Sequence, residues 1–295
     1  MKPFHAVGAW LVFGLAALVA VLPLDAAWAG DEPIRVLSFN IRYGTARDGR
    51  NAWPLRRELV FDVLRRERWD FVGLQEALRF QLDEIHRAVD GFGEIGVGRD
   101  DGKQRGEYSA ILYRQDRWFA QHSGTFWLSD TPDVPGSKSW GNGIPRIVTW
   151  GRFVERKTRR AVWVFNTHFD HQSQPSREKS AHALAASIAR KTEGEPVIVT
   201  GDFNAGEDNP AMRYLLSPDS GSPVHLRDTF RVRHPKATDV GTFHGFTGRT
   251  QGDKIDYVLV DRHFEVLAAD IIRFTRDGRY PSDHFPVMAT VRLIR

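Results

Sequence analysis

Short strand-like runs alternate along this chain with segments of helical periodicity. The runs lie at 34–40, 71–74, 108–113, 161–166, 196–199, 255–260 and 284–293. Between them, apolar residues recur every three or four positions in 54–68, 78–89 and 176–191, which predicts three amphipathic helices. Helices that alternate with apolar strands predict a layered α/β fold.

The run at 196–199 passes directly into Thr200 and then Gly201-Asp202-Phe203-Asn204. Asp202 and Asn204 are two positions apart, so their side chains are expected to point the same way at the edge of a strand. An acid and an amide placed together suit a water nucleophile and a phosphate oxygen. Asp and Asn also close strands into turns for purely structural reasons, so this stretch alone leaves both interpretations open.

Polar residues stand at six strand ends in total. They are Asn40, Glu76, His168 with Asp170, Asp202 with Asn204, Asp256, and Asp283 with His284. In an open α/β sheet, ligands bind beyond the carboxyl ends of the strands, so these side chains are expected to share one site. Six such ends together are hard to explain as turns.

The types of side chain at these ends indicate which ligand they would hold. Carboxylates and amides suit a hard divalent cation, and the histidines are then free for proton and phosphate work. Zinc would take more histidine or cysteine ligands, and the chain has no cysteine, so Mg²⁺ is predicted, with Mn²⁺ as a possible substitute. Asp170 and His171 are interpreted as residues that orient His168, and Arg146 and Arg177 as surface residues.

Residues 1–29 have the pattern of a signal peptide: Lys2, an apolar run over 6–24, and the small residues of Ala27-Trp28-Ala29. An uncleaved membrane anchor is the alternative, because the run is about long enough to span a bilayer. The small-x-small site favours cleavage after Ala29, which leaves no membrane anchor. Residues 30–295 are then expected to form a single exported catalytic domain, periplasmic or secreted and monomeric.

The net charge of +4 and the pI of about 9.4 would tolerate a polyanionic partner, but the basic residues are scattered. Their densest cluster, 152–160, surrounds a predicted hairpin turn at 155–158. We interpret it as a solvated turn, and nucleic acid is a possible but not a favoured partner.

The segment 125–150 is rich in turn-forming residues and contains Trp127, Trp140 and Trp150, which predicts a long loop. The tryptophans could stack on a sugar or a base, or they could attach the loop to the core.

Six motifs, in this order, resemble those of the endonuclease/exonuclease/phosphatase superfamily, also called DNase I-like. They are Ser38-Phe39-Asn40, Gln75-Glu76, Asn166-Thr167-His168-Phe169-Asp170, Gly201-Asp202-Phe203-Asn204, Lys254-Ile255-Asp256-Tyr257 and Ser282-Asp283-His284-Phe285-Pro286-Val287. The resemblance spans residues 34–293 and implies a four-layer α/β sandwich, in which two packed mixed β-sheets are flanked by helices. It also implies metal-dependent hydrolysis of a phosphate ester.

The resemblance implies a role for each motif residue. Metal ligands would be Glu76, Asn40 and Asp283. Asp202 would be the acid that orients or deprotonates the attacking water or assists the leaving oxygen, and Asn204 would donate to a phosphate oxygen. His284 would face the phosphate, held by Asp256, and His168 would be the second active-site histidine.

Other segments, such as 98–103, 106–109 and 136–146, are similar to an exported bacterial subgroup of this superfamily. The leading hypothesis is a phosphatase or phosphodiesterase for small or sugar-linked esters, with the tryptophan-rich loop shaping the pocket. A secreted DNase I-like endonuclease is the alternative, and a non-catalytic binding module is a third. Monoester and diester hydrolysis both stay open, as do one and two metal ions.

Overall fold

The computed structural model describes residues 1, 3 and 32–294. The predicted signal peptide lies outside the described residues, apart from Met1 and Pro3. The chain divides into Met1–Glu32 and Pro33–Arg295, and both sheets belong to the second unit. Within the described ranges, no helix has the length and apolar character needed to cross a membrane.

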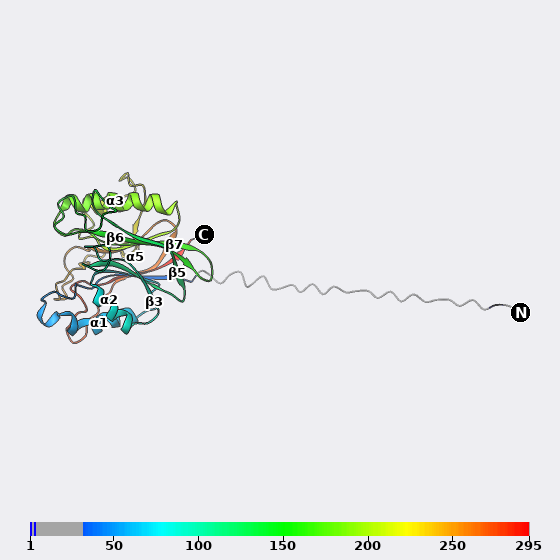
Figure 1. Cartoon of the computed structure of the whole chain (residues 1–295), viewed down its shortest axis with the longest axis horizontal. Helices are drawn as coiled ribbons and strands as arrows, with labels where there is room; N and C mark the ends of the chain where they lie inside the picture. Colours follow the sequence, from blue (N-terminus) through cyan, green and yellow to red (C-terminus); the bar gives the residue numbers. More distant parts are fainter. Residues whose placement is uncertain (2, 4–31, 295) are drawn as a thin grey trace. The chain divides into compact units, whose positions relative to one another are not determined.

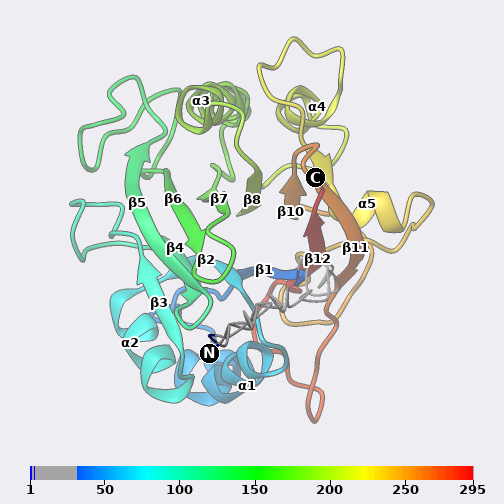
Figure 2. The same ribbon diagram turned by 90° about the vertical axis from the view of Figure 1, so that its right-hand side faces the viewer.

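Two six-stranded sheets pack face to face (Figures 1 and 2). The first has the order β11 (Phe264–Ile271), β12 (Val287–Leu293), β1 (Ile34–Asn40), β2 (Phe71–Ala77), β4 (Tyr108–Arg114), β3 (Phe92–Ile95). The second has the order β5 (Trp118–Trp127), β6 (Ile147–Glu155), β7 (Ala161–His168), β8 (Val197–Asp202), β10 (Asp256–Val260), β9 (Arg227–Asp228). Both sheets are mixed, because β1–β2 and β7–β8 pair in parallel and the other neighbours antiparallel.

Helices cover the outer faces of the two sheets, α1 and α2 on one side and α3 on the other (Figure 1). The helices are η2 (Gly49–Asn51), α1 (Trp53–Arg65), α2 (Arg79–Ala88), α3 (Gln174–Thr192), α4 (Pro210–Leu216) and α5 (Thr229–Arg233). The longest, α3, begins where the Ser173 side chain accepts a hydrogen bond from the Ser176 backbone N–H, and its C-cap, Glu193, is left-handed. The predicted four-layer sandwich is confirmed.

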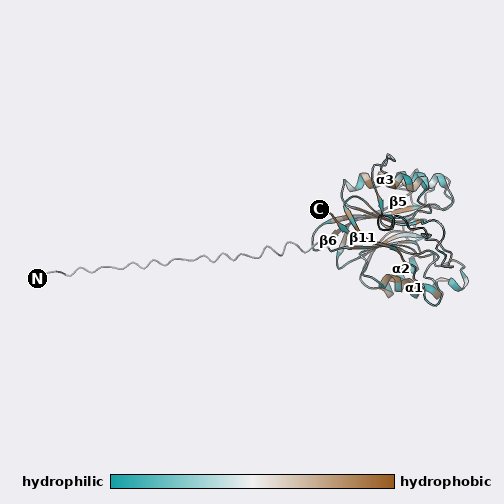
Figure 3. Cartoon of the chain, turned by 180° about the vertical axis from the view of Figure 1, so that it is seen from behind, coloured by the Kyte–Doolittle hydropathy of each residue, from teal (hydrophilic) through white to brown (hydrophobic). Residues whose placement is uncertain are grey.

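Three hydrophobic clusters fill the spaces between the four layers, and the outer helices α1 and α3 carry both hydrophobic and hydrophilic residues (Figure 3). One lies between the two sheets and includes Val36, Val164 and Ile198. The second packs α3 and α4 on one sheet, and the third packs α1 and α2 on the other. Because a fully buried aliphatic side chain contributes about 1.5–3 kcal/mol, these clusters dominate the stability of the fold.

The inter-sheet faces of the strands change from apolar to polar toward one end. Alternate residues of a strand share a face, so the order along each strand shows this change directly. The inter-sheet residues are Ile34, Val36, Ser38 and Asn40 in β1; Val162, Val164, Asn166 and His168 in β7; and Ile198, Thr200 and Asp202 in β8. Each strand therefore delivers its last inward-facing side chain to the same polar edge.

Asn166 joins the two sheets through a fully satisfied buried amide. Its Nδ2 donates to the carbonyl oxygens of Leu74, at 2.9 Å, and Ala110, at 2.8 Å. Its Oδ1 accepts from Gln75 Nε2, at 2.7 Å, and from Thr200 Oγ1, at 3.0 Å. Since an amide offers two donors and one oxygen with two lone pairs, every hydrogen-bonding position of Asn166 is used.

Neighbouring residues extend this network and require a close approach of the sheets. The Gly201 N–H donates to Ser38 Oγ across the interface at 3.0 Å. A Cβ atom at Gly73 would lie 2.0 Å from Thr200 Oγ1, so no side chain fits there. We refer to Ser38, Gln75, Asn166 and Thr200 as the polar seam.

The sequence-based elements need several corrections. The predicted loop 125–150 is shorter, because β5 extends to Trp127 and β6 begins at Ile147. The last strand begins at Val287 rather than at residue 284. The expectation misses β3, β5, β6, β9 and β11 as well as η2, α4 and α5. The predicted turn at 155–158 is confirmed between β6 and β7.

We predict that Asn166→Leu strongly destabilises the fold, because it leaves two carbonyl oxygens, Gln75 and Thr200 without their buried partner. Each orphaned group costs about 1–3 kcal/mol, so the free energy of unfolding should fall by at least about 3 kcal/mol. Urea denaturation followed by circular dichroism measures this change. The control, Thr167→Val, removes a single bond to the Ile147 carbonyl and should cost about 1 kcal/mol. Equal losses in the two variants would contradict the role of the seam.

Candidate active site

A cleft of about 620 Å³ opens at the polar edge of the inter-sheet space. Of the eight predicted site residues, six line it: Glu76, His168, Asp202, Asn204, Asp283 and His284. The other two, Asn40 and Asp256, are buried directly against these residues, Asn40 against Glu76 and Asp202, and Asp256 against His284. The structure therefore brings all eight together.

The strand ends that meet here are not all carboxyl ends, which corrects the sequence interpretation. Asp256 is the first residue of β10, and Asp283 and His284 precede β12. Because β10 runs antiparallel to β8, and β12 antiparallel to β1, their amino ends lie beside the carboxyl ends of those strands. In the register of β10 and β8, Asp256 stands opposite Asp202.

Asp202 is the hub of the site. Its Oδ2 accepts a hydrogen bond from Asn40 Nδ2 at 3.0 Å and lies 3.5 Å from His168 Nε2 and 3.8 Å from His284 Nε2. Its Oδ1 accepts from the Asn204 N–H at 2.9 Å. Burial and the charge of Asp256 raise the pKa of the Asp202 carboxyl to about 7, although His284 opposes this. Asp202 can therefore exchange a proton near neutral pH.

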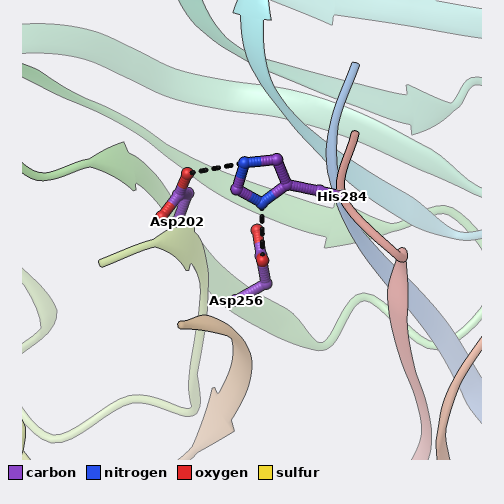
Figure 4. Close-up of side chains that lie close together, drawn as sticks. All are labelled: Asp202, Asp256 and His284. Atoms are coloured by element: carbon purple, nitrogen blue, oxygen red, sulfur yellow. Dashed lines mark hydrogen bonds and ion pairs between the residues drawn. The ribbon is translucent and has the colours of Figure 1, made fainter. Parts of the chain in front are cut away.

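His284 is held between two carboxylates (Figure 4). Its Nδ1 lies 2.9 Å from Asp256 Oδ2, and its Nε2 faces Asp202. Burial alone would lower the pKa of the imidazole, but Asp256 and Asp202 raise it well above its ordinary value. His284 is therefore a cation at neutral pH, with Asp256 fixing its orientation.

His168, in contrast to His284, is neutral. Burial lowers the pKa of its imidazole well below the ordinary value, and the charges of Arg146 and Arg99 lower it further. Its Nδ1 makes no hydrogen bond with the described part of the chain and lies 4.0 Å from Glu107 Oε2. The site thus holds one neutral and one protonated histidine on either side of Asp202.

Glu76 reaches the cleft because of a β-bulge. The register between β2 and β4 shifts between Leu74 and Ala77, and Glu76 has a φ of 60°. A bulge redirects side chains, so Glu76 faces the cleft while its neighbour Gln75 belongs to the polar seam. Asn204 also has a positive φ, 47°. Such backbone conformations in residues other than glycine collect at functional sites.

The oxygen-rich side of the cleft fits a hard divalent cation. Glu76 Oε1 accepts from Asn40 Nδ2 at 3.0 Å, and Oε2 accepts from the Tyr43 N–H at 3.0 Å. Burial raises the pKa of Asp283, and repulsion from Glu76 adds to the shift, so a cation would relieve this contact. Asn40 Oδ1 accepts from the Arg42 N–H and keeps one lone pair free. The three predicted ligands are therefore chemically suited to Mg²⁺.

A second group could also hold a metal, since ligand-type atoms of Asp202, Asp256 and His284 lie within 4.8 Å of one another. We consider it less suited, because both ring nitrogens of His284 face carboxylates and the ring is protonated. A metal ligand must be a neutral imidazole.

Arg146, expected at the surface, is in fact buried and lines the cleft, with 1% of its surface exposed. Its Nε lies 3.4 Å from Asp170 Oδ2, and its Nη2 lies 2.8 Å from His171 Nδ1. Asp170 and His171 therefore position Arg146, and the expectation that they orient His168 is wrong.

The cleft is also lined, from loops, by Arg42, Arg99 and Glu107, which were not predicted as site residues. Arg42 follows Asn40 by two positions, and this proximity to a motif is the signal that could have found it. Arg99 lies in the loop between β3 and β4, and Glu107 directly precedes β4. Both stand in segments, 98–103 and 106–109, that resemble the exported subgroup, but no role was predicted for either residue.

The tryptophans of 125–150 attach this segment to the core. Trp127 is buried and its Nε1 donates to the Arg99 carbonyl at 2.7 Å, and Trp150 packs on Trp163. Trp140 Nε1 donates to Asp130 Oδ1 at 2.8 Å. The loop does border the cleft, through Ile144 and Arg146, but none of its three tryptophans is among the residues that line it.

Comparison with known proteins agrees with this architecture. A sequence model described as the endonuclease/exonuclease/phosphatase family matches residues 37–284. The chain therefore belongs to this family. Its members hydrolyse phosphate esters, and the predicted class of enzyme, a phosphoester hydrolase, is confirmed.

Three individual proteins illustrate the similarity. A family protein from Bacteroides thetaiotaomicron is 32% identical, with a TM-score of 0.81 over 90% of this chain and 99% of that one. The mannosyl-6-phosphatase of Bacteroides thetaiotaomicron VPI-5482 is 33% identical, with a TM-score of 0.78 over 89% of this chain and 100% of that one. An uncharacterized protein of Acanthamoeba polyphaga mimivirus is 27% identical over 59% of this chain and 68% of its own length.

Proposed function

We propose that this protein is a Mg²⁺-dependent phosphatase or phosphodiesterase that acts on small or sugar-linked phosphate esters. The observation that carries the proposal is the position of Asp202 between a neutral and a protonated histidine, inside a cleft that also presents Glu76. Groups whose pKa values are driven apart in this way are suited to separate acid and base roles.

Asp202 is the proton acceptor for the attacking water, because its raised pKa lies near the working pH of a neutral-pH enzyme. Protonated His284 donates from Nε2 toward the phosphate, and Asp256 keeps it in that orientation and charge state. Asn204 uses one Nδ2 hydrogen on the Phe169 carbonyl and has a second for a phosphate oxygen. These donors are fixed before substrate arrives, so they need no reorganisation during the reaction.

Glu76, Asn40 and Asp283 would hold the metal ion. When bound, a divalent ion neutralises charge on the phosphate oxygens and lowers the pKa of a coordinated water. Asn40 also contributes without a metal, because its Nδ2 donates to both Glu76 and Asp202 and fixes their separation. Mn²⁺ is expected to substitute, since it also prefers oxygen ligands.

The proposed substrate class rests on the cleft and on one relative. A volume of about 620 Å³ lies in the range of small-molecule sites, which span about 300–1,000 Å³. A protein that shares a third of its sequence with this chain is a mannosyl-6-phosphatase. Both observations favour a small ester over a duplex nucleic acid.

Asp202→Asn should abolish turnover and leave the fold intact, because the amide keeps the shape of the carboxyl group but cannot accept a proton. We expect kcat to fall by about 10²–10⁴, the usual contribution of a general base. Steady-state kinetics on p-nitrophenyl phosphate and mannose 6-phosphate measure the loss, and thermal melting checks the fold. A variant that keeps half of the activity would exclude Asp202 as the acid or base.

Glu76→Gln should weaken binding of Mg²⁺ or Mn²⁺ at least about tenfold, since it removes a charged ligand. Isothermal titration with the metal alone tests this without substrate, and Glu58→Gln, an exposed glutamate of α1, is the control.

In parallel, Mg²⁺-dependent hydrolysis is measured on supercoiled plasmid and on sugar, lipid and nucleotide phosphate esters. Plasmid nicking that disappears in Glu76→Gln would make the protein a secreted nuclease instead.

We also propose that the enzyme acts outside the cytoplasm after removal of residues 1–29. The support is the apolar run and the small residues of Ala27-Trp28-Ala29. Expression of the full chain in a bacterium, followed by amino-terminal sequencing of the periplasmic or secreted protein, should give Gly30 as the first residue. An intact amino terminus in the membrane fraction would support the anchor instead.

A further inference from the structure

Two buried arginines line a wall of the cleft that the proposed mechanism does not use. Arg99 comes from the loop between β3 and β4, and Arg146 from the segment that precedes β6. Arg99 makes a bidentate pair with Glu107, at 2.7 and 2.8 Å. Both arginines are also anchored through their backbones, since the Arg99 carbonyl accepts from Trp127 Nε1 and the Arg146 carbonyl from the Leu128 N–H. The wall is therefore rigid.

Two donors on this wall, Arg146 Nη1 and Arg99 Nε, lack a hydrogen-bond partner among the described residues, and so does the ring nitrogen His168 Nδ1. Buried polar groups are almost always paired with protein, water or a ligand. A guanidinium is a strong multiple donor with no acceptor atom, so its missing partner must bring acceptor oxygens. The unpaired donors of this wall are therefore suited to bind a group that carries hydrogen-bond acceptors.

The charges here favour an anion over a second metal ion. Burial and the nearby charge of Arg99 both lower the pKa of Arg146. A further positive charge beside Arg146 would therefore be destabilising. Glu107 and Asp170, the carboxylates that contact the two arginines, are already paired with Arg99 and Arg146, so neither is free to hold a cation. A divalent cation would be repelled by two guanidiniums, whereas an anion would relieve their mutual repulsion.

We propose that Arg146 and Arg99 form a subsite for the terminal phosphate of a phosphomonoester, and that this subsite makes the enzyme a monoesterase. The proposal deepens, and rests on, the function proposed above. A monoester phosphate has three non-bridging oxygens and about one more negative charge than a diester, which has two such oxygens. Arg146 Nη1 and Arg99 Nε are the guanidinium donors still without a partner, and a charge-assisted hydrogen bond from them is stronger to the more highly charged oxygens of a monoester.

The test compares a monoester, p-nitrophenyl phosphate, with a diester, bis(p-nitrophenyl) phosphate, in the full chain and in Arg146→Met. We expect kcat/KM for the monoester to fall at least about tenfold more than that for the diester, because a charge-assisted bond to the extra oxygen is lost. Arg146→Lys, which keeps the charge but not the fork, should lie between the two. A purely structural role of Arg146 would lower both esters equally, and that outcome would overturn the proposal.

Binding of inorganic phosphate gives a readout that does not depend on turnover. In isothermal titration with Mg²⁺ present, the dissociation constant should rise about tenfold in Arg146→Met, since a charged donor to the anion is lost. Arg177→Met is the control, because Arg177 donates to the Asp170 carbonyl at 2.9 Å but does not line the cleft. Unchanged phosphate affinity in Arg146→Met would overturn the subsite.

The two proposals fail in different ways. If the wild-type protein cleaves the diester alone, the subsite proposal is overturned and the phosphoester hydrolase stands. If it cleaves neither ester, the proposed function fails, and the phosphate titration decides on the anion site by itself. Loss of phosphate binding in Arg146→Met then supports the site, and unchanged binding rejects it.

Discussion

The buried hydrogen bonds of the polar seam hold the two sheets in the one register that assembles the site. Asn166 is bonded to β2, β4 and β8 at once, so neither sheet can slide without breaking several buried bonds. His168 and Asp202 follow the seam residues Asn166 and Thr200 by two positions, on the same face of their strands. Because a slip of one residue would turn each side chain to the opposite face, the seam specifies the site geometry as well as the packing.

The sequence predicts the residues that terminate strands, because a polar residue after an apolar run can be recognised from the order of residues alone. It placed Asn40, Glu76, His168 and Asp202 together, and their strands carry them to the same edge. It could not predict that Asp256 arrives at the amino end of an antiparallel strand, because pairing direction is decided by partners distant in sequence. The bulge at Glu76 and the position of Arg99 in the cleft could not be predicted either, because both also depend on partners distant in sequence.

Two buried histidines of this cleft have different charge states because their neighbours differ. His284 and His168 are both buried, but carboxylates surround the first and guanidiniums stand near the second, so their charge states differ. The aspartates near His284 come from strands, whereas the arginines near His168 come from loops. The sheets thus supply the groups for proton transfer, whereas the loops determine the electrostatic character of the opposite wall. Because loops vary more than sheets, members of a family can differ there in the substrates that they bind.

The hydrogen bond from the Gly201 N–H to Ser38 Oγ ties the backbone beside Asp202 to the opposite sheet. That amide can exchange with solvent only when the sheets part, which is a large excursion from the native state rather than a local fluctuation. The floor of the cleft and the centre of the protein therefore belong to one cooperative unit. Motions that admit substrate must take place in the surrounding loops, and the reacting groups cannot become disordered unless the protein itself begins to unfold.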